Sequence, residues 1–192
     1  MRIIEGLVLL KDLDDSFIID LRYASTNNFT GKIIYPLHVC AIRKETGEKL
    51  VKAHNIFKKD GYRIKVWDAY RPLHVQRLLF EACPYNDYVA KPPEKPITSG
   101  FRTRHNNGMA VDVTLVDKDG NELEMPSDFD DFTEKGKLNY EHMTKEARKN
   151  VDYLHEVMNR VGFRSYVNEW WHFVDNIEEP TPYLDIPLDV FL

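Results

Sequence analysis

The sequence predicts an α+β fold in which a mainly antiparallel central sheet is flanked by helices. Helical and strand-like segments are interspersed along the 192 residues, without the regular alternation of a doubly wound parallel sheet. Some segments repeat apolar residues at helical spacing, whereas others alternate or are rich in aromatic residues, as strands are. The length suits a single domain over residues 1–192.

Three segments have the spacing and end signals of helices. They run from Glu45 to Asp60, from Pro72 onwards, and from the candidate N-cap Thr144 to Gly162. Three segments are expected to be strands. They are Arg63 to Trp67, Met109 to Leu115, and Glu169 to Val174. The stretches from Pro84 to Thr98 and from Val116 to Tyr140 are expected to be loops.

Bulk properties exclude several classes of protein. The net charge of −5 and the pI near 5.8 argue against a nucleic-acid partner. No apolar run approaches the roughly 20 residues that span a bilayer. The N-terminal stretch does not read as a secretory signal, so we expect a cytoplasmic protein, or a periplasmic one if a leader was removed. Cys40 and Cys83 are in no metal-binding pattern, and two buried thiols are favoured over a disulfide. The sequence gives no indication of oligomeric state.

The strand from Met109 to Leu115 contains a carboxylate among apolar residues. Asp112 lies on the face opposite Val111 and Val113. His105 precedes it, and Gly108 allows a sharp turn between the two. An imidazole and a carboxylate brought together in this way are ligands that zinc accepts. The competing interpretation is an exposed loop histidine and a surface aspartate.

The segment from Glu169 to His172 places a carboxyl group and an imidazole beside two tryptophans. Indole rings exclude water, which raises the pKa of a nearby carboxyl group toward neutrality. Residues three apart on an ideal strand face opposite sides. Glu169 and His172 can therefore share a site only if Glu169 precedes the strand or lies at a bulge or bend. We expect regular pairing to begin at about Trp170. The alternative is a buried aromatic strand whose polar groups only form hydrogen bonds.

A third group lies between a predicted strand and a helix that begins with proline. Arg71 is held there at a rigid junction, where a guanidinium can stabilise an oxyanion. A local Asp68–Arg71 ion pair with a structural role is the alternative. Together the three groups supply three zinc ligands, an additional carboxylate and an arginine. Three protein ligands leave one zinc position for water, as in catalytic sites, so amide hydrolysis is the predicted chemistry.

These residues resemble a known family pattern. The run TRHNNGMAVD from Thr103 to Asp112 and the run EWWH from Glu169 to His172 resemble the pattern S-x-H-x-x-G-x-A-x-D … E-x-W-H. This is the pattern of zinc D,D-peptidases related to the hedgehog N-terminal domain. DLRYASTNNFTG from Asp20, WDAYRP from Trp67 and YLDIP from Tyr183 narrow the resemblance to D-alanyl-D-alanine dipeptidases of the vancomycin-resistance type.

The resemblance implies a role for each matched residue. The expected ligands of one zinc ion per chain are His105, Asp112 and His172. Glu169 would be the catalytic base and acid, and Arg71 would stabilise the tetrahedral intermediate.

The resemblance also implies substrate-binding residues. Asp130 would bind the free amine of a small dipeptide, with Asp128 and Asp131 near enough to be alternatives. Tyr23 and Thr103 would lie beside the substrate. Thr103 departs from the serine usual in the family, and Asn107 from a common arginine, which places fine substrate preference in doubt. The remaining histidines are expected to be structural or solvated. They are His38, His54, His74, His142 and His155.

Three functions compete on this pattern. The first is hydrolysis of D-alanyl-D-alanine to two D-alanines. The second is a D,D-carboxypeptidase acting on the peptide stems of cell-wall precursors, which would need a cleft open at the amine side. The third is a non-catalytic zinc module, which would need neither Glu169 nor Arg71. The biological role, whether glycopeptide resistance, wall turnover or nutrient use, is not indicated.

Overall fold

The computed structural model describes residues 1–83, 88–95, 103–178 and 181–192. In the five-stranded sheet, the strands are β2 (Ile18–Ile19), β4 (Arg63–Asp68), β5 (Ala110–Val116), β7 (Glu169–Asp175) and β6 (Phe163–Tyr166), in that spatial order. Only β2 and β4 pair in parallel, and the other three pairings are antiparallel. The chain is therefore α+β with a mainly antiparallel sheet, as the sequence predicts.

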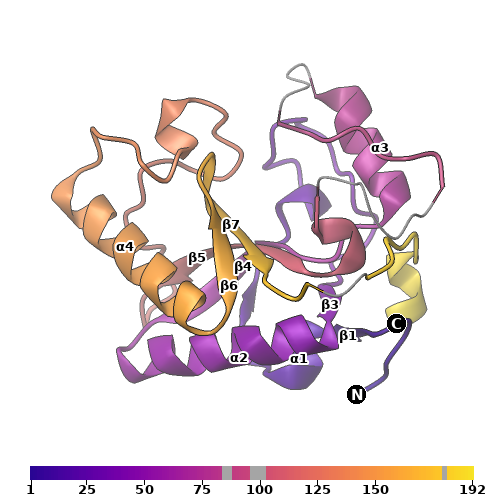
Figure 1. Cartoon of the computed structure of the whole chain (residues 1–192), viewed down its shortest axis with the longest axis horizontal. Coiled ribbons are helices and arrows are strands. Elements are labelled where there is room, and N and C mark those ends of the chain that lie inside the picture. The colour runs from indigo at the N-terminus through magenta and orange to yellow at the C-terminus, as the bar shows by residue number, and fades with distance from the viewer. Residues whose placement is uncertain (84–87, 96–102, 179–180) are drawn as a thin grey trace.

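Helices cover this sheet, and a small second sheet lies beside it. The helices are α1 (Leu10–Leu13), α2 (Lys44–Lys59), α3 (Leu73–Ala82) and α4 (Lys145–Arg160). Strands β1 (Leu7–Leu9) and β3 (Ala41–Arg43) form the antiparallel second sheet. Figure 1 shows α2 and α4 along one side of the molecule and α3 away from them at the upper right. The 3₁₀ turns are η1 (Arg22–Ala24), η2 (His105–Asn107), η3 (Glu134–Gly136) and η4 (Leu188–Phe191).

The predicted helices match the observed ones closely. The Thr144 side chain accepts a hydrogen bond from the backbone N–H of Ala147 and so caps α4, as expected. Gly61 and Gly162 follow α2 and α4 with positive φ angles of 84° and 100°, which are accessible to glycine. Pro72 differs from the prediction, because its extended ψ of 147° makes it the N-cap and α3 begins at Leu73.

The start of β7, between β5 and β6, corrects one expectation. Strand β7 begins at Glu169, which pairs with Tyr166, and not at Trp170. The register then shifts, because Ser165 pairs with Phe173. The three residues between the two pairs on β7 have no counterpart on β6, so the strand bulges there. The bulge, and not a late start of the strand, allows Glu169 and His172 to face the same side.

Other expectations concern loops, thiols and membrane segments. Cys40 and Cys83 are both buried, and no disulfide joins them. The predicted loop from Pro84 to Thr98 lies partly outside the described residues, whereas the stretch from Val116 to Tyr140 contains the short turn η3. Across the described ranges, none of the helices combines the length and the apolar character needed to cross a bilayer.

Candidate metal centre and active site

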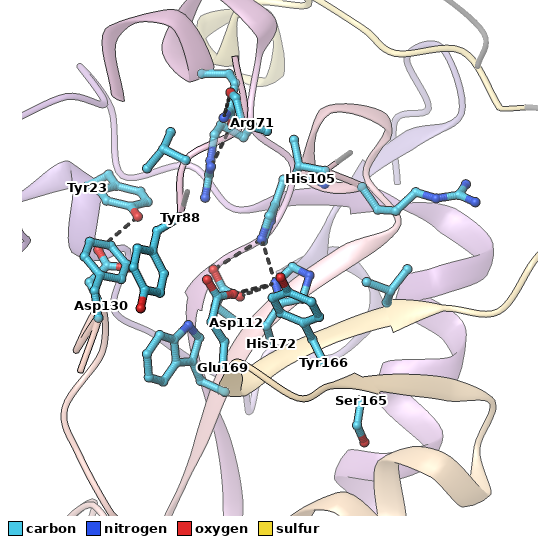
Figure 2. A pocket seen from close by; sticks show the side chains of 18 of the residues that line it. Tyr23, Arg71, Tyr88, His105, Asp112, Asp130, Ser165, Tyr166, Glu169 and His172 are labelled. Carbon is cyan, nitrogen blue, oxygen red and sulfur yellow. Dashed lines mark hydrogen bonds and ion pairs between the residues drawn. The ribbon is translucent and has the colours of Figure 1, made fainter. Parts of the chain in front are cut away.

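A cavity of about 570 Å³ opens beside the central sheet. Its wall contains all eight residues singled out from the sequence. Those residues are Tyr23, Arg71, Thr103, His105, Asp112, Asp130, Glu169 and His172. Figure 2 shows Asp112, His105 and His172 converging at the centre, with Tyr23 and Asp130 on one side and Tyr166 on the other.

The sheet itself positions two of the candidate ligands. Asp112 on β5 pairs in register with His172 on β7, so their side chains are neighbours on one face. On its other side, Asp112 pairs with Asp68 at the end of β4. Asp112 is buried and His172 is half-buried toward the cavity. Strand pairing thus fixes both donors before any metal binds.

The third ligand candidate comes from the turn that precedes β5. His105 begins η2, and Gly108 ends that turn with a left-handed φ of 74°. A Cβ atom at Gly108 would lie 2.8 Å from the backbone nitrogen of Arg43, so the turn also needs the space that glycine leaves. The Nδ1–H of His105 donates to the carbonyl oxygen of Ala69 at 2.7 Å. That bond fixes the tautomer and leaves Nε2 of His105 to bind a metal.

The three side chains fit a zinc ion. Nε2 of His105 lies 3.3 Å from Nδ1 of His172 and 3.3 Å from Oδ2 of Asp112. Nδ1 of His172 lies 2.8 Å from Oδ1 of Asp112. Tetrahedral zinc with bonds of about 2.1 Å places neighbouring donor atoms about 3.4 Å apart. Burial would raise the pKa of Asp112, but the two imidazoles beside it outweigh burial and lower that pKa. The carboxyl group is therefore in its metal-binding, ionised form.

Glu169 lies next to this group without being part of it. Its Oε2 is 3.8 Å from Nδ1 of His172, and its side chain is 17% exposed. Burial raises the pKa of Glu169 to about 7, and the charge of Asp112 acts in the same direction, whereas His172 opposes both. A carboxyl group with a pKa in this range exchanges protons readily near neutral pH.

Arg71 is held by two buried side chains. Its Nε and Nη2 donate to Oδ2 of Asp68 at 2.9 and 2.6 Å, and its Nη1 donates to Oε1 of Gln76 at 2.8 Å. Oδ1 of Asp68 accepts from the hydroxyl of Tyr35 at 2.6 Å. The Asp68–Arg71 ion pair, which the sequence offered as the structural alternative to a catalytic role, is therefore present. Because the guanidinium has five N–H donors, two remain beyond these three bonds, and Arg71 lines the cavity.

The opposite end of the cavity is built around Asp130. Its Oδ2 accepts a hydrogen bond from the Tyr23 hydroxyl at 3.0 Å. Burial and the charge of Asp112 raise the pKa of Asp130 well above its usual value. Of the two alternatives, Asp128 pairs with Arg22 at 2.6 Å and Asp131 accepts from the backbone N–H of Thr133. Neither of them lines the cavity.

Thr103 and the remaining histidines complete the sequence candidates. The hydroxyl oxygen of Thr103 accepts from the backbone N–H of His105 at 3.3 Å and lines the cavity. His155 bonds to Ser165 Oγ and Trp170 O, and Nδ1 of His54 accepts from the Ile64 backbone N–H. None of the five other histidines lines the cavity.

Several cavity residues were missed by sequence reasoning. Gln76 lies five residues beyond Arg71 on the buried face of α3, and nothing in its sequence context indicated a contact with that arginine. Tyr88 and Phe132 stack at a centroid distance of 4.7 Å, and Tyr166 stands edge-on to His172. These aromatic residues come from segments that only the folded chain brings together.

The cavity contains two imidazoles and a carboxylate that could bind a metal, a carboxyl group with a pKa of about 7, and a buried guanidinium. This is the composition of a zinc hydrolase. Residues 4–189 match the family model described as D-ala-D-ala dipeptidase. The chain therefore belongs to this family of metallopeptidases.

Individual relatives agree with the family match. The D-alanyl-D-alanine dipeptidase of Escherichia coli (strain K12) is 34% identical over 171 residues, which cover 89% of this chain and 83% of the relative. That of Enterococcus faecium is 30% identical over 198 residues, covering 95% and 98%. A solved structure of the vancomycin resistance D,D-pentapeptidase VanY in complex with Zn(II) is 16% identical, with a TM-score of 0.42, covering 71% of this chain and 73% of that chain. The sheet of this chain itself, and not this likeness, shows the α+β fold.

Proposed function

We propose that this protein hydrolyses the dipeptide D-alanyl-D-alanine to two D-alanines with one zinc ion bound by His105, Asp112 and His172. The observation that carries the proposal is the arrangement around Asp112. With its two neighbouring imidazoles it forms a group that could hold a metal ion, and Glu169 and Arg71 line the same cavity. The family match and the relatives named D-alanyl-D-alanine dipeptidase support this substrate.

The chain's own residues supply proton transfer. When bound at these three side chains, zinc would lower the pKa of a water molecule and polarise the scissile carbonyl. Glu169 would accept a proton from the attacking water and return it to the leaving amine. A carboxyl group with a pKa of about 7 can perform both transfers in one turnover, because neither of its protonation states is costly near neutrality.

Arg71 would stabilise the negative charge that develops on the carbonyl oxygen. Its bonds to Asp68 and Gln76 hold the guanidinium rigid, so it need not reorganise as the charge forms. Burial lowers its pKa and Asp68 raises it, with a net rise, so Arg71 stays charged. The Asp68–Arg71 ion pair is thus compatible with a catalytic role.

Asp130 would bind the substrate's ammonium group, with Tyr23 orienting its carboxylate and Thr103 lining the wall beside the metal ligands. A buried carboxyl group whose pKa is raised gains most from a cationic partner, because that partner offsets the cost of its charge. This requirement for a free amine favours a dipeptidase over a D,D-carboxypeptidase, whose substrates have a blocked amine.

The proposal is tested by D-alanine release from D-alanyl-D-alanine before and after treatment with a chelator and after re-addition of zinc. We expect activity that is lost with the metal and restored by it. The N-acetylated dipeptide serves as the comparison. Hydrolysis of the acetylated compound at a rate equal to or above that of the free dipeptide would favour the carboxypeptidase and contradict the proposal.

The cellular compartment stays a prediction. We propose that the protein is located in the cytoplasm. Fractionation of cells followed by immunoblotting tests this, and recovery in the periplasmic fraction would contradict it.

A further inference from the structure

The dipeptide has two charged ends, an ammonium group and a carboxylate, and the proposed site has a partner for only the first of them. Asp130 is suited to the ammonium group. The carboxylate of the leaving residue also needs hydrogen-bond donors, because a desolvated carboxylate without donors is costly. The acids that line the described part of the cavity are Asp112, Asp130 and Glu169. The carboxylate therefore has to lie away from them.

The position of Asp130 sets the direction of the substrate. Figure 2 shows Asp130 and Tyr23 on one side of the metal ligands, and Tyr166 on the opposite side beside His172. A dipeptide with its amine at Asp130 and its scissile bond over the ligands extends toward Tyr166. Residues of β6, among them Tyr166, line the cavity there, and Val174 on β7 lines the same cavity.

Tyr166 has a hydroxyl group suited to that position. Its ring lies edge-on to the His172 ring with centroids 5.8 Å apart, and Figure 2 shows its hydroxyl turned toward the metal ligands. The hydroxyl oxygen accepts a hydrogen bond from Nδ2 of Asn168 at 3.2 Å. In the described part of the chain its own proton has no acceptor, so the O–H is available to a ligand.

The same face of β6 also carries a positive charge. Arg164 lies two residues before Tyr166, so both side chains project to one side of the strand, and both line the cavity. Ser165 between them also lines the cavity, but its hydroxyl is engaged by Nδ1 of His155 at 2.7 Å. Glu169 pairs with Tyr166 through the bulge of β7, which ties this wall to the catalytic carboxyl group.

We propose that Tyr166 binds the C-terminal carboxylate of the dipeptide through its phenolic O–H, with Arg164 supplying positive potential behind it. This inference rests on the proposed function, since it assigns the second end of the same substrate. Tyr166 is then a specificity-determining residue that requires a free carboxylate on the leaving amino acid.

The test compares two substrates and three proteins. The substrates are D-alanyl-D-alanine and its C-terminal carboxamide, which has the same shape but no negative charge. The proteins are the wild type, Tyr166→Phe, and the control Tyr140→Phe, which removes a hydroxyl outside the cavity. A hydrogen bond to a charged group is worth about 10- to 100-fold. We expect Tyr166→Phe to lower kcat/KM for the dipeptide by about 10-fold and to change that for the carboxamide by less than about 2-fold.

The preference for free acid over carboxamide is a ratio, so partial misfolding of a variant does not alter it. A ratio in Tyr166→Phe equal to that of the wild type and of Tyr140→Phe would overturn the carboxylate role, whether activity falls on both substrates or on neither. Failure of the wild type to hydrolyse the dipeptide at all would contradict the proposed function, and the two failures are therefore distinguishable.

Discussion

The two ends of the cavity are built in different ways. One end, here called the metal end, holds the proposed zinc ligands and is formed by paired strands, where Asp112 and His172 occupy one register position across β5 and β7. The other, here called the amine end, holds the proposed partner of the ammonium group and is formed by loops, where Asp130 has a left-handed φ of 58° and contacts Tyr23, 107 positions earlier in the chain. Strand pairing leaves the metal end little freedom, whereas the position of Asp130 depends on loop packing. We therefore expect the metal end to determine whether the reaction occurs, and the amine end to determine which substrate is accepted.

The largest expected effect is at the strand end. Asp112→Asn keeps the size of the side chain but removes the negative charge of the carboxylate that lies beside both imidazoles. We expect zinc affinity to fall by at least about 100-fold, and activity with it. Zinc content after dialysis, measured by atomic absorption, together with D-alanine release, checks this. A variant that retained a full equivalent of zinc and wild-type activity would show that Asp112 is not a ligand.

A smaller and more selective effect is expected at the loop end. Asp130→Ala removes the proposed partner of the ammonium group, so kcat/KM for the free dipeptide should fall by about 10- to 100-fold. Activity on the N-acetylated dipeptide should fall much less, because that substrate has no ammonium group. The comparison variant Arg71→Ala should reduce both activities alike. Equal losses in Asp130→Ala would contradict the amine-binding role.

The last effect is on stability and not on substrate choice, and it concerns the support of the strand end. His155 bonds to the carbonyl oxygen of Trp170 in the bulge of β7, and burial lowers the pKa of His155 to about 4. Between pH 6.5 and 4 the unfolded chain therefore binds a proton that the folded chain excludes. The contribution of neutral His155 to the free energy of unfolding is complete above pH 6.5 and decreases as the pH falls toward 4, by about 3 kcal/mol.

Urea denaturation of the wild type at pH 7 and pH 4.5 measures this loss. His155→Gln has no titrating imidazole at this position, so its free energy of unfolding should fall less over the same interval. An equal fall in both proteins would show that His155 does not contribute to the acid sensitivity.

The same contrast explains what the sequence could predict. Helices α2 and α4 and strands β4 and β5 have long periodic patterns, and their predicted bounds lie within about two residues of the observed ones. Strands β1, β2 and β3 have only two or three residues each, too few for a period. β2 forms by pairing with β4, and β1 and β3 form by pairing with each other, so they depend on contacts that the local sequence does not show.

The site follows the same rule. Asp112 and His172 could be singled out as candidates because each lies on a strand with an apolar or aromatic pattern, and the resemblance to the family pattern then assigned them as ligands. Asp130 could not be separated from Asp128 and Asp131 by spacing, since only folding turns one of the three into the cavity. Tyr166 gave no signal, because the bulge that aligns it with Glu169 depends on pairing between β6 and β7.

The most direct test of the account is the zinc content and activity of Glu169→Gln. Glutamine fills the same space beside His172 but cannot take up a proton, and Glu169 is not one of the three proposed ligands. We predict one zinc ion per chain, as in the wild type, and a fall in kcat of about 10³-fold or more on D-alanyl-D-alanine. A variant that kept its zinc and also kept wild-type kcat would contradict the assignment of Glu169 as the base.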